Sequence, residues 1–225
     1  MRILLVRHGE SVGNVDITRY RETPDFVIPL SERGHEQAEA VATFLDSFMW
    51  NLGPAVGRGA APPMFRLWVS PYTRARQTAD PIEKAIKLNL IDRREHILLA
   101  EQQFGVLDGI AGLSVEEHYP DHDARYKLYR EHGGKFWCRM PAGENRFDVA
   151  CRVHQAFGTF HRDADKHGIH NLIIVAHGTV IRAFVMMWLH LPYEWVEKEP
   201  NPKNCSVRLI EDGEDKGYIY EGGTP

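Results

Sequence analysis

The sequence predicts an α/β fold, a three-layer α/β/α sandwich with a mostly parallel central sheet and a small inserted cap. Short apolar runs alternate along the chain with longer segments of helical periodicity, the pattern of a parallel sheet flanked by helices. Two of the runs, over residues 3–6 and 172–176, lead into a histidine followed by a glycine. Because ligands bind beyond the carboxyl ends of strands in such sheets, both histidines are expected at a binding site.

The first half of the chain holds two strand–helix pairs. Its strands are short apolar runs bounded by charge, proline or glycine, and its helices carry apolar residues three and four positions apart. The elements expected are a strand over 3–6, a helix over 34–48, an exposed Gly/Ala/Pro-rich loop over 53–63, a strand over 65–69 and a helix over 73–86. Pro81 is expected to bend the second helix, because proline cannot donate the backbone hydrogen bond of a helix interior.

The second half opens with a segment of different character. Residues 100–140 are rich in charge and aromatic side chains and weak in periodicity, which indicates a cap inserted over the site, with short helices such as one over 114–119. The elements that follow are a helix over 144–164, a strand over 172–176, a helix over 179–189 and closing strands over 205–211 and 217–220. No repeat or linker is visible, so residues 1–225 are expected to form a single domain.

Composition and charge restrict the kind of protein. A net charge of −4 argues against a nucleic-acid partner, whose binding surface is normally basic. The three cysteines lack metal-type spacing and predict free thiols in a reducing compartment. The N-terminal apolar run is too short for a signal peptide, and the most apolar stretch, over 172–191, is interrupted by His177, Arg182 and His190. A cytoplasmic location without a membrane partner is therefore expected.

A third strand end adds a cation to the two histidines. The segment after residue 69 places Arg74 near a helix N-terminus, where backbone N–H groups favour an anion. Arg7, His8, Arg74 and His177 are then expected at one rim of the sheet. Two guanidinium groups can hold phosphate oxygens while a neutral histidine attacks phosphorus. The other histidine, when protonated, would stabilise the transferring group.

A proton donor for the leaving oxygen is still needed. Glu101 opens the cap, and a carboxyl beside an enclosed phosphate has the raised pKa of a general acid. Glu144 is interpreted as a helix-start residue rather than a catalyst. His118 and His122 are spaced four apart, but Pro120 lies between them and no third ligand is evident, so no metal site is predicted.

At these residues the chain resembles the histidine phosphatase superfamily, also called the phosphoglycerate mutase-like family. The matching motifs are Arg7-His8-Gly9-Glu10-Ser11 with Asn14, Leu30 to Gly34 with Gln37-Ala38, Ser70-Pro71 with Arg74-Ala75 and Gln77-Thr78-Ala79, Glu101 with Gly105 and Gly109, Pro141-Ala142-Gly143-Glu144, and His177-Gly178 with Ile181-Arg182. The resemblance implies His8 as phosphoryl acceptor and Glu101 as proton donor. It implies Arg7, Asn14, Arg74 and His177 as the phosphate pocket, and no metal or other cofactor.

Two further residues directly follow the second histidine. Gly178 and Thr179 are expected to bind phosphate, Thr179 through its N–H or hydroxyl; an equally open interpretation is that Thr179 only begins a helix.

Differences from the mutase motifs in the cap indicate the branch of the family. Cofactor-dependent mutases carry Arg-His-Tyr-Gly after the acid, whereas this chain has Gln102-Gln103-Phe104-Gly105 and so lacks a cation and a phenol. The adjacent arginine pair with which mutases grip a carboxylate is absent between Gly109 and Trp137. The resemblance is therefore to a phosphatase-type subgroup.

The function expected is a metal-independent phosphomonoester hydrolase that acts through a phosphohistidine at His8 on a phosphorylated small molecule. One alternative is a 2,3-bisphosphoglycerate-dependent phosphoglycerate mutase. Another is a binding or scaffold protein on the same fold with weak activity. Dimers are frequent in this family, so a homodimer is an expectation for the assembly.

Overall fold

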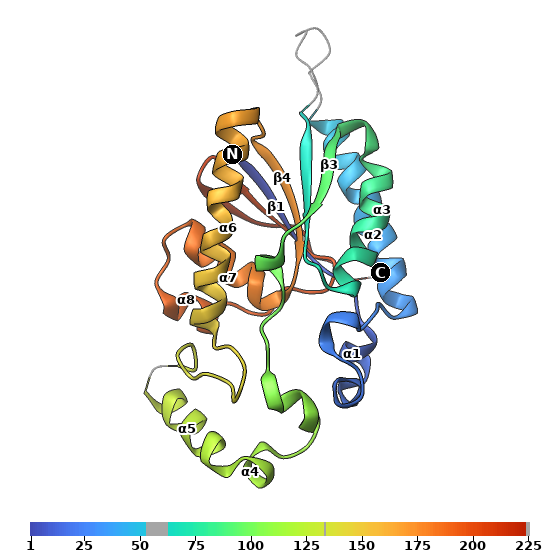
Figure 1. The fold of residues 1–225 in the computed structure, drawn as a ribbon. Coiled ribbons are helices and arrows are strands. Elements are labelled where there is room, and N and C mark those ends of the chain that lie inside the picture. Colours follow the sequence, from blue (N-terminus) through green and yellow to red (C-terminus); the bar gives the residue numbers. More distant parts are fainter. Residues whose placement is uncertain (53–62, 133, 224–225) are drawn as a thin grey trace, which may run out of the picture.

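A six-stranded sheet runs through the middle of the molecule, with helices on both of its faces (Figure 1). The computed structural model describes residues 1–52, 63–132 and 134–223, so the loop expected over 53–63 lies, apart from Pro63, outside the described residues. The strands are β1 (Arg2–Arg7), β2 (Phe65–Val69), β3 (Leu90–Glu95), β4 (Asn171–Ala176), β5 (Val207–Glu211) and β6 (Glu214–Tyr220). Their order across the sheet is β3-β2-β4-β1-β5-β6.

The register of the sheet brings three strand ends to one level. Strands β3, β2, β4 and β1 run parallel, and β5 and β6 add an antiparallel edge. The mostly parallel sheet predicted from the sequence is therefore confirmed. Val175 pairs with both Val6 of β1 and Val69 of β2. The residues that follow these three strands consequently emerge side by side.

Two pairs of helices cover the sheet. Helices α2 (Glu32–Asn51) and α3 (Thr73–Ala85) pack on one face, and α6 (Arg146–His167) and α7 (Gly178–Trp188) on the other (Figure 1). Successive residues of a strand point to opposite faces of the sheet, where they join two separate hydrophobic cores. Leu4 faces α2 and α3, whereas Leu5 faces α6 and α7. Each large apolar side chain buried in this way contributes about 1.5–3 kcal/mol of transfer free energy. The three-layer α/β/α sandwich is confirmed.

Local capping sets where the long helices begin and end. The Ser31 hydroxyl accepts a hydrogen bond from the Gly34 N–H at 3.0 Å, which starts α2. At the start of α6, Asn145 and Asp148 form a reciprocal capping box. Gly168, in the left-handed conformation with φ 67°, ends the same helix. The helix expected over 144–164 therefore runs slightly later in the chain.

The remaining elements are short and lie mostly around one end of the sheet. They are α1 (Val12–Val15), η1 (Ile17–Arg21), η2 (Asp25–Val27), η3 (Lys87–Asn89), η4 (Ile97–Leu99), η5 (Gly105–Ile110), α4 (Val115–His118), α5 (Pro120–Glu131) and α8 (Tyr193–Lys198). Residues 100–140, called the cap below, extend away from the sheet (Figure 1). The helix expected over 114–119 is α4, and Ser114 caps its start. No helix in the described part of the chain is long and apolar enough to cross a membrane.

Strand β3 and helix α8 are not among the elements expected from the sequence. Residues 92–95 of β3 are all charged, so the strand lacks the apolar run from which the other strands were predicted. Among the described residues, β3 is an edge strand that pairs with β2 alone, and its side chains can stay at least partly exposed there. Pro81 lies within α3, which continues to Ala85.

The turn after β1 is held against the start of α2 by two glycines. A Cβ on Gly34 would overlap the Glu10 carbonyl oxygen, and a Cβ on Gly9 would come within 2.5 Å of the Gly34 carbonyl oxygen. The Ser31 N–H donates to the same Glu10 carbonyl oxygen at 2.8 Å. Close backbone approach at this point fixes the position of His8, the residue before Gly9.

We predict that Gly34→Ala lowers the free energy of unfolding by about 3 kcal/mol, because overlap with the backbone outweighs the gain of about 1 kcal/mol in helix propensity. Urea denaturation would measure this loss. Gly109→Ala is the matched control, since a Cβ there meets no atom of the described residues within 4 Å. Equal stability of the two variants would contradict the tight contact.

Candidate active site

Two buried histidines lie at the carboxyl ends of adjacent parallel strands. His8 follows β1, His177 follows β4, and they are 3% and 0% exposed. Their ring centroids are 5.1 Å apart. The His8 N–H continues the ladder by donating to the Ala176 carbonyl oxygen at 3.0 Å. Strand pairing therefore brings together two residues that are far apart in the sequence.

The contacts of His8 define which ring nitrogen is free. Nδ1 lies 2.6 Å from the carbonyl oxygen of Gly9, which can only accept a hydrogen bond, so Nδ1 carries the proton. The Nε of Arg74 donates to His8 Nε2 at 3.3 Å, which requires a lone pair on Nε2. Burial, and then the charges of Arg74 and Arg7, lower the pKa of His8 well below its usual value. The ring is consequently neutral at pH 7, with Nε2 able to act as a nucleophile.

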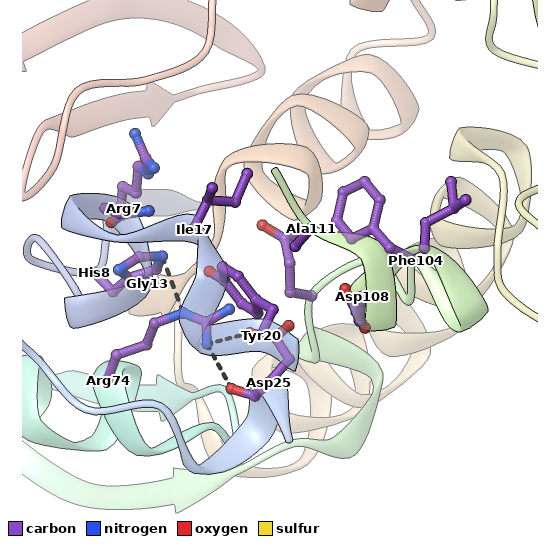
Figure 2. A pocket seen from close by; sticks show the side chains of 13 residues that line it. Arg7, His8, Gly13, Ile17, Tyr20, Asp25, Arg74, Phe104, Asp108 and Ala111 are labelled. Atoms are coloured by element: carbon purple, nitrogen blue, oxygen red, sulfur yellow. Dashed lines mark hydrogen bonds and ion pairs between the residues drawn. The ribbon is translucent and has the colours of Figure 1, made fainter. Parts of the chain in front are cut away.

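Arg74 is held by a carboxylate that the sequence did not single out. Its Nη1 donates to Asp25 Oδ1 at 2.7 Å and to the Asp25 carbonyl oxygen at 2.8 Å (Figure 2). The guanidinium also stacks over the Tyr72 ring, 5.0 Å from its centroid. Arg74 is only 3% exposed, so the Asp25 countercharge offsets much of the cost of burying it.

Arg7 and Asn14 present donors to the same cavity. Arg7 donates through Nη1 to the Pro202 carbonyl oxygen, and its buried Nε has no acceptor in the part of the chain that the structure describes. Burial lowers the pKa of Arg7. The Asn14 Oδ1 accepts from the Ser11 N–H at 3.1 Å and from Asn204 Nδ2 at 3.3 Å. These contacts commit the Asn14 oxygen and leave its amide hydrogens as donors.

The second histidine, His177, and the two residues that follow it have different surroundings. His177 Nε2 lies 2.7 Å from the Ser70 hydroxyl oxygen, while its buried Nδ1 has no partner among residues 1–52, 63–132 and 134–223. Burial, followed by the charge of Arg74, lowers its pKa well below the usual value. Gly178 begins α7, and a Cβ at this position would overlap the Asn201 side chain. Thr179 lines a second cavity, described below, rather than the cavity of His8.

Glu101 reaches the cavity from the start of the cap. Its carboxylate accepts the Gln102 N–H at 2.9 Å, and Arg152 holds its backbone through a hydrogen bond of 3.0 Å to the carbonyl oxygen. Burial raises the pKa of Glu101, as a general acid requires. Glu144, two residues before α6, forms an ion pair with the same Arg152 at 2.8 Å. It therefore anchors the cap and does not enter the cavity of His8.

A cavity of about 410 Å³ lies beside His8, and His177, Gly178 and Thr179 are not among the residues that line it. Of the residues singled out from the sequence, Arg7, His8, Asn14, Arg74 and Glu101 line it. The structure adds Ile17, Tyr20 and Asp25 from the segment after β1, and Phe104, Leu107 and Asp108 from the cap. Sequence reasoning missed these residues because they lie in turns and short 3-10 helices that have no periodic pattern.

A second cavity of about 270 Å³ lies beside the first and shares Glu101 and Phe104 with it. Its lining includes the cations Lys135, Arg146 and Arg182. Arg146 forms an ion pair of 2.7 Å with Glu197, and Glu197 does not line the cavity. This second space is therefore basic in character.

The site thus holds a neutral histidine, the buried Arg74, the half-buried Arg7 and a carboxyl group with a raised pKa, a set suited to binding a phosphorylated group. The chain belongs to the Histidine phosphatase superfamily (branch 1), whose family model matches residues 3–221. The family that the sequence motifs indicated is confirmed.

Known proteins similar to this chain carry different activities in their names. Phosphoglycerate mutase-like protein AT74 of Arabidopsis thaliana is 34% identical over 96% of this chain, which spans 66% of that relative's length. A 2,3-bisphosphoglycerate-dependent phosphoglycerate mutase 2 of Gloeobacter violaceus is 28% identical over 87% of the chain and 79% of its own length. The structure of a mycobacterial glucosyl-3-phosphoglycerate phosphatase superposes with a TM-score of 0.69 at 22% identity, covering 100% of this chain and 98% of that one, which shows the shared fold.

We predict that Asp25→Ala lowers the free energy of unfolding by about 3 kcal/mol, because it leaves the buried Arg74 without its countercharge. Asp80→Ala, which breaks the exposed pair with Arg93, is the matched control and is expected to cost less than about 1 kcal/mol. Urea denaturation of both variants at pH 7 would compare them. A loss at Asp25 no larger than that at Asp80 would contradict the role given to this pair.

Proposed function

We propose that this protein is a phosphomonoester hydrolase that acts through a phosphohistidine at His8. The observation that carries the proposal is the tautomer of that residue. Its Nδ1 proton is donated to Gly9, so the Nε2 lone pair is directed to the Arg74 side of the cavity. Neutral imidazole with one fixed nitrogen is an effective nucleophile near pH 7.

In the first step, Arg7, Arg74 and the Asn14 amide bind the phosphoryl oxygens of the substrate. His8 Nε2 attacks phosphorus as the bond to the leaving oxygen breaks, and Glu101 gives that oxygen a proton. Two guanidinium groups offset the charge on the transferring group, so we propose that no metal ion is required.

His177 is proposed to stabilise the same transferring group. Its ring lies 5.1 Å from that of His8, and its buried Nδ1 lacks a hydrogen-bond partner among the described residues. An arriving phosphoryl dianion would favour the protonated ring, against the burial that now holds its pKa low.

In the second step, water hydrolyses the phosphohistidine. Glu101, now ionised, removes a proton from the attacking water, the bond between His8 Nε2 and phosphorus breaks, and inorganic phosphate leaves. Both residues return to their starting protonation states. The cycle therefore needs one substrate and one water.

A phosphoglycerate mutase is the second candidate, favoured by the basic second cavity, whose Lys135 and Arg182 have the charge to hold a carboxylate. The mutase would retain the phosphoryl group on His8 and pass it back to a glycerate, so it would release little phosphate.

Phosphate release from a panel of phosphomonoesters that includes 3-phosphoglycerate, with EDTA present, tests the proposal. We expect release from several esters and an acid-labile, alkali-stable phosphate on the protein. His8→Ala should lower release by more than about a thousandfold, because the nucleophile is lost. His167→Ala, at an exposed position of α6, is the control and should retain activity. Interconversion of 3- and 2-phosphoglycerate without release would instead identify a mutase.

Glu101→Gln should have an effect that depends on the leaving group. On an alkyl phosphate we expect kcat/KM to fall about a hundredfold, because the alkoxide needs a proton. On p-nitrophenyl phosphate we expect a loss of less than about tenfold, because that phenolate leaves without one.

The same variant should change the pH profile for alkyl esters. Glu101 is protonated below its raised pKa, so wild-type kcat/KM should fall as pH rises through that value. This limb should be missing in Glu101→Gln, which has no titrating carboxyl. Equal losses on both kinds of ester would show that Glu101 is not the acid.

A further inference from the structure

The cavity of His8 has two unlike sides. Figure 2 shows Arg7, His8 and Arg74 on one side and Phe104 and Asp108 on the other. The first side would hold the phosphoryl group. The leaving group would therefore extend toward the second side, which is formed by the cap.

The walls between the two sides are largely apolar. Ile17 comes from η1, and Leu107 and Ala111 come from the cap. A hydrogen bond of 2.6 Å from Arg21 Nε to the Ala111 carbonyl oxygen ties these two segments together. A leaving group with an apolar body would bury surface against both walls.

Apart from the proposed acid Glu101, Asp108 is the one polar residue among the described cap residues that line this cavity. It lies on η5 and is half-buried, and its carboxylate accepts no hydrogen bond from the described residues. Burial, and then the charge of Asp25, raise the pKa of Asp108 to about 6. At pH 7 the carboxylate is mostly ionised and faces the cavity without a donor.

The charges available to a substrate differ between the two sides. Arg74 is already paired with Asp25, and the phosphoryl dianion would engage Arg7 and Arg74 together. A second anionic group on the leaving side would meet Asp108 and no further cation among the cavity's described lining residues. Repulsion between Asp108 and an anionic group in the same partly buried cavity disfavours binding of such a leaving group.

We infer that the physiological leaving group is an alcohol with an apolar body, without a second anionic group, that carries a hydroxyl or ammonium donor for Asp108. This inference rests on the proposed hydrolase activity and names the substrate class of the same site. Hydroxyl and ammonium share the hydrogen bond to the carboxylate, and ammonium adds a charge interaction.

A series of para-substituted phenyl phosphates would test the inference. Phenyl phosphates with a para aminoethyl, hydroxyethyl, propyl or carboxyethyl group have similar leaving oxygens and differ chiefly in the donor or charge at the far end. We expect kcat/KM at pH 7 to be highest for aminoethyl, then hydroxyethyl, then propyl, and at least about tenfold lower for carboxyethyl than for aminoethyl.

Substitutions at Asp108 should change the ratio of kcat/KM for the aminoethyl ester to kcat/KM for the carboxyethyl ester, in a protein that retains His8. Asp108→Asn should reduce the aminoethyl-to-carboxyethyl ratio to about twofold, and Asp108→Lys should reverse it. Asp121→Asn, an exposed acidic position of the cap outside both cavities, is the matched control and should keep the wild-type ratio.

The outcomes separate this inference from the hydrolase proposal. Turnover of all four esters, lost in His8→Ala but with an unchanged ratio in Asp108→Asn, would overturn the inference and leave the hydrolase standing. A carboxyethyl preference that disappears in Arg182→Met would also overturn it, by placing the leaving group in the basic second cavity. Phosphate release that persists in His8→Ala would remove the hydrolase mechanism itself.

Discussion

Parallel pairing of β1 with β4 is the constraint on which the site depends. The register that sets Arg7 opposite Ala176 makes both strands end at one level, and the His8 N–H extends the ladder by one more bond. The histidines that follow must then share one edge of the sheet. Without this pairing, two residues so far apart in the sequence would not be held with their ring centroids 5.1 Å apart.

Charge balance around the strand ends depends in turn on a few fixed contacts. The buried Arg74 forms an ion pair with Asp25. The Asn14 side chain offers only its N–H donors, because its oxygen accepts hydrogen bonds from Ser11 and Asn204. These groups are oriented before any ligand arrives. A site of this kind loses little freedom when it binds an anion, which is the general basis of electrostatic preorganisation.

The sequence predicted the sheet, its two helical layers and the family, because those depend on apolar periodicity and on motifs at strand ends. It predicted a cap over the site, but neither β3 nor the cap residues that form the far wall of the cavity. In β3, tertiary pairing outweighs a charge-rich sequence. Tyr20, Asp25 and Asp108 reach the cavity through irregular backbone, where residue type gives no indication of direction. The basic second cavity likewise combines the cap with residues of α6 and α7, a long-range contact that local patterns do not encode.

Elements η5, α4 and α5 of the cap have no buried residue. Substitutions at exposed positions usually change folding free energy by less than about 0.5 kcal/mol. The part of the molecule that would choose the substrate is therefore nearly separate from the part that keeps it folded. Members of a lineage built on this plan can exchange residues of these three elements, and with them the range of accepted molecules, while the sheet and its histidines stay unchanged.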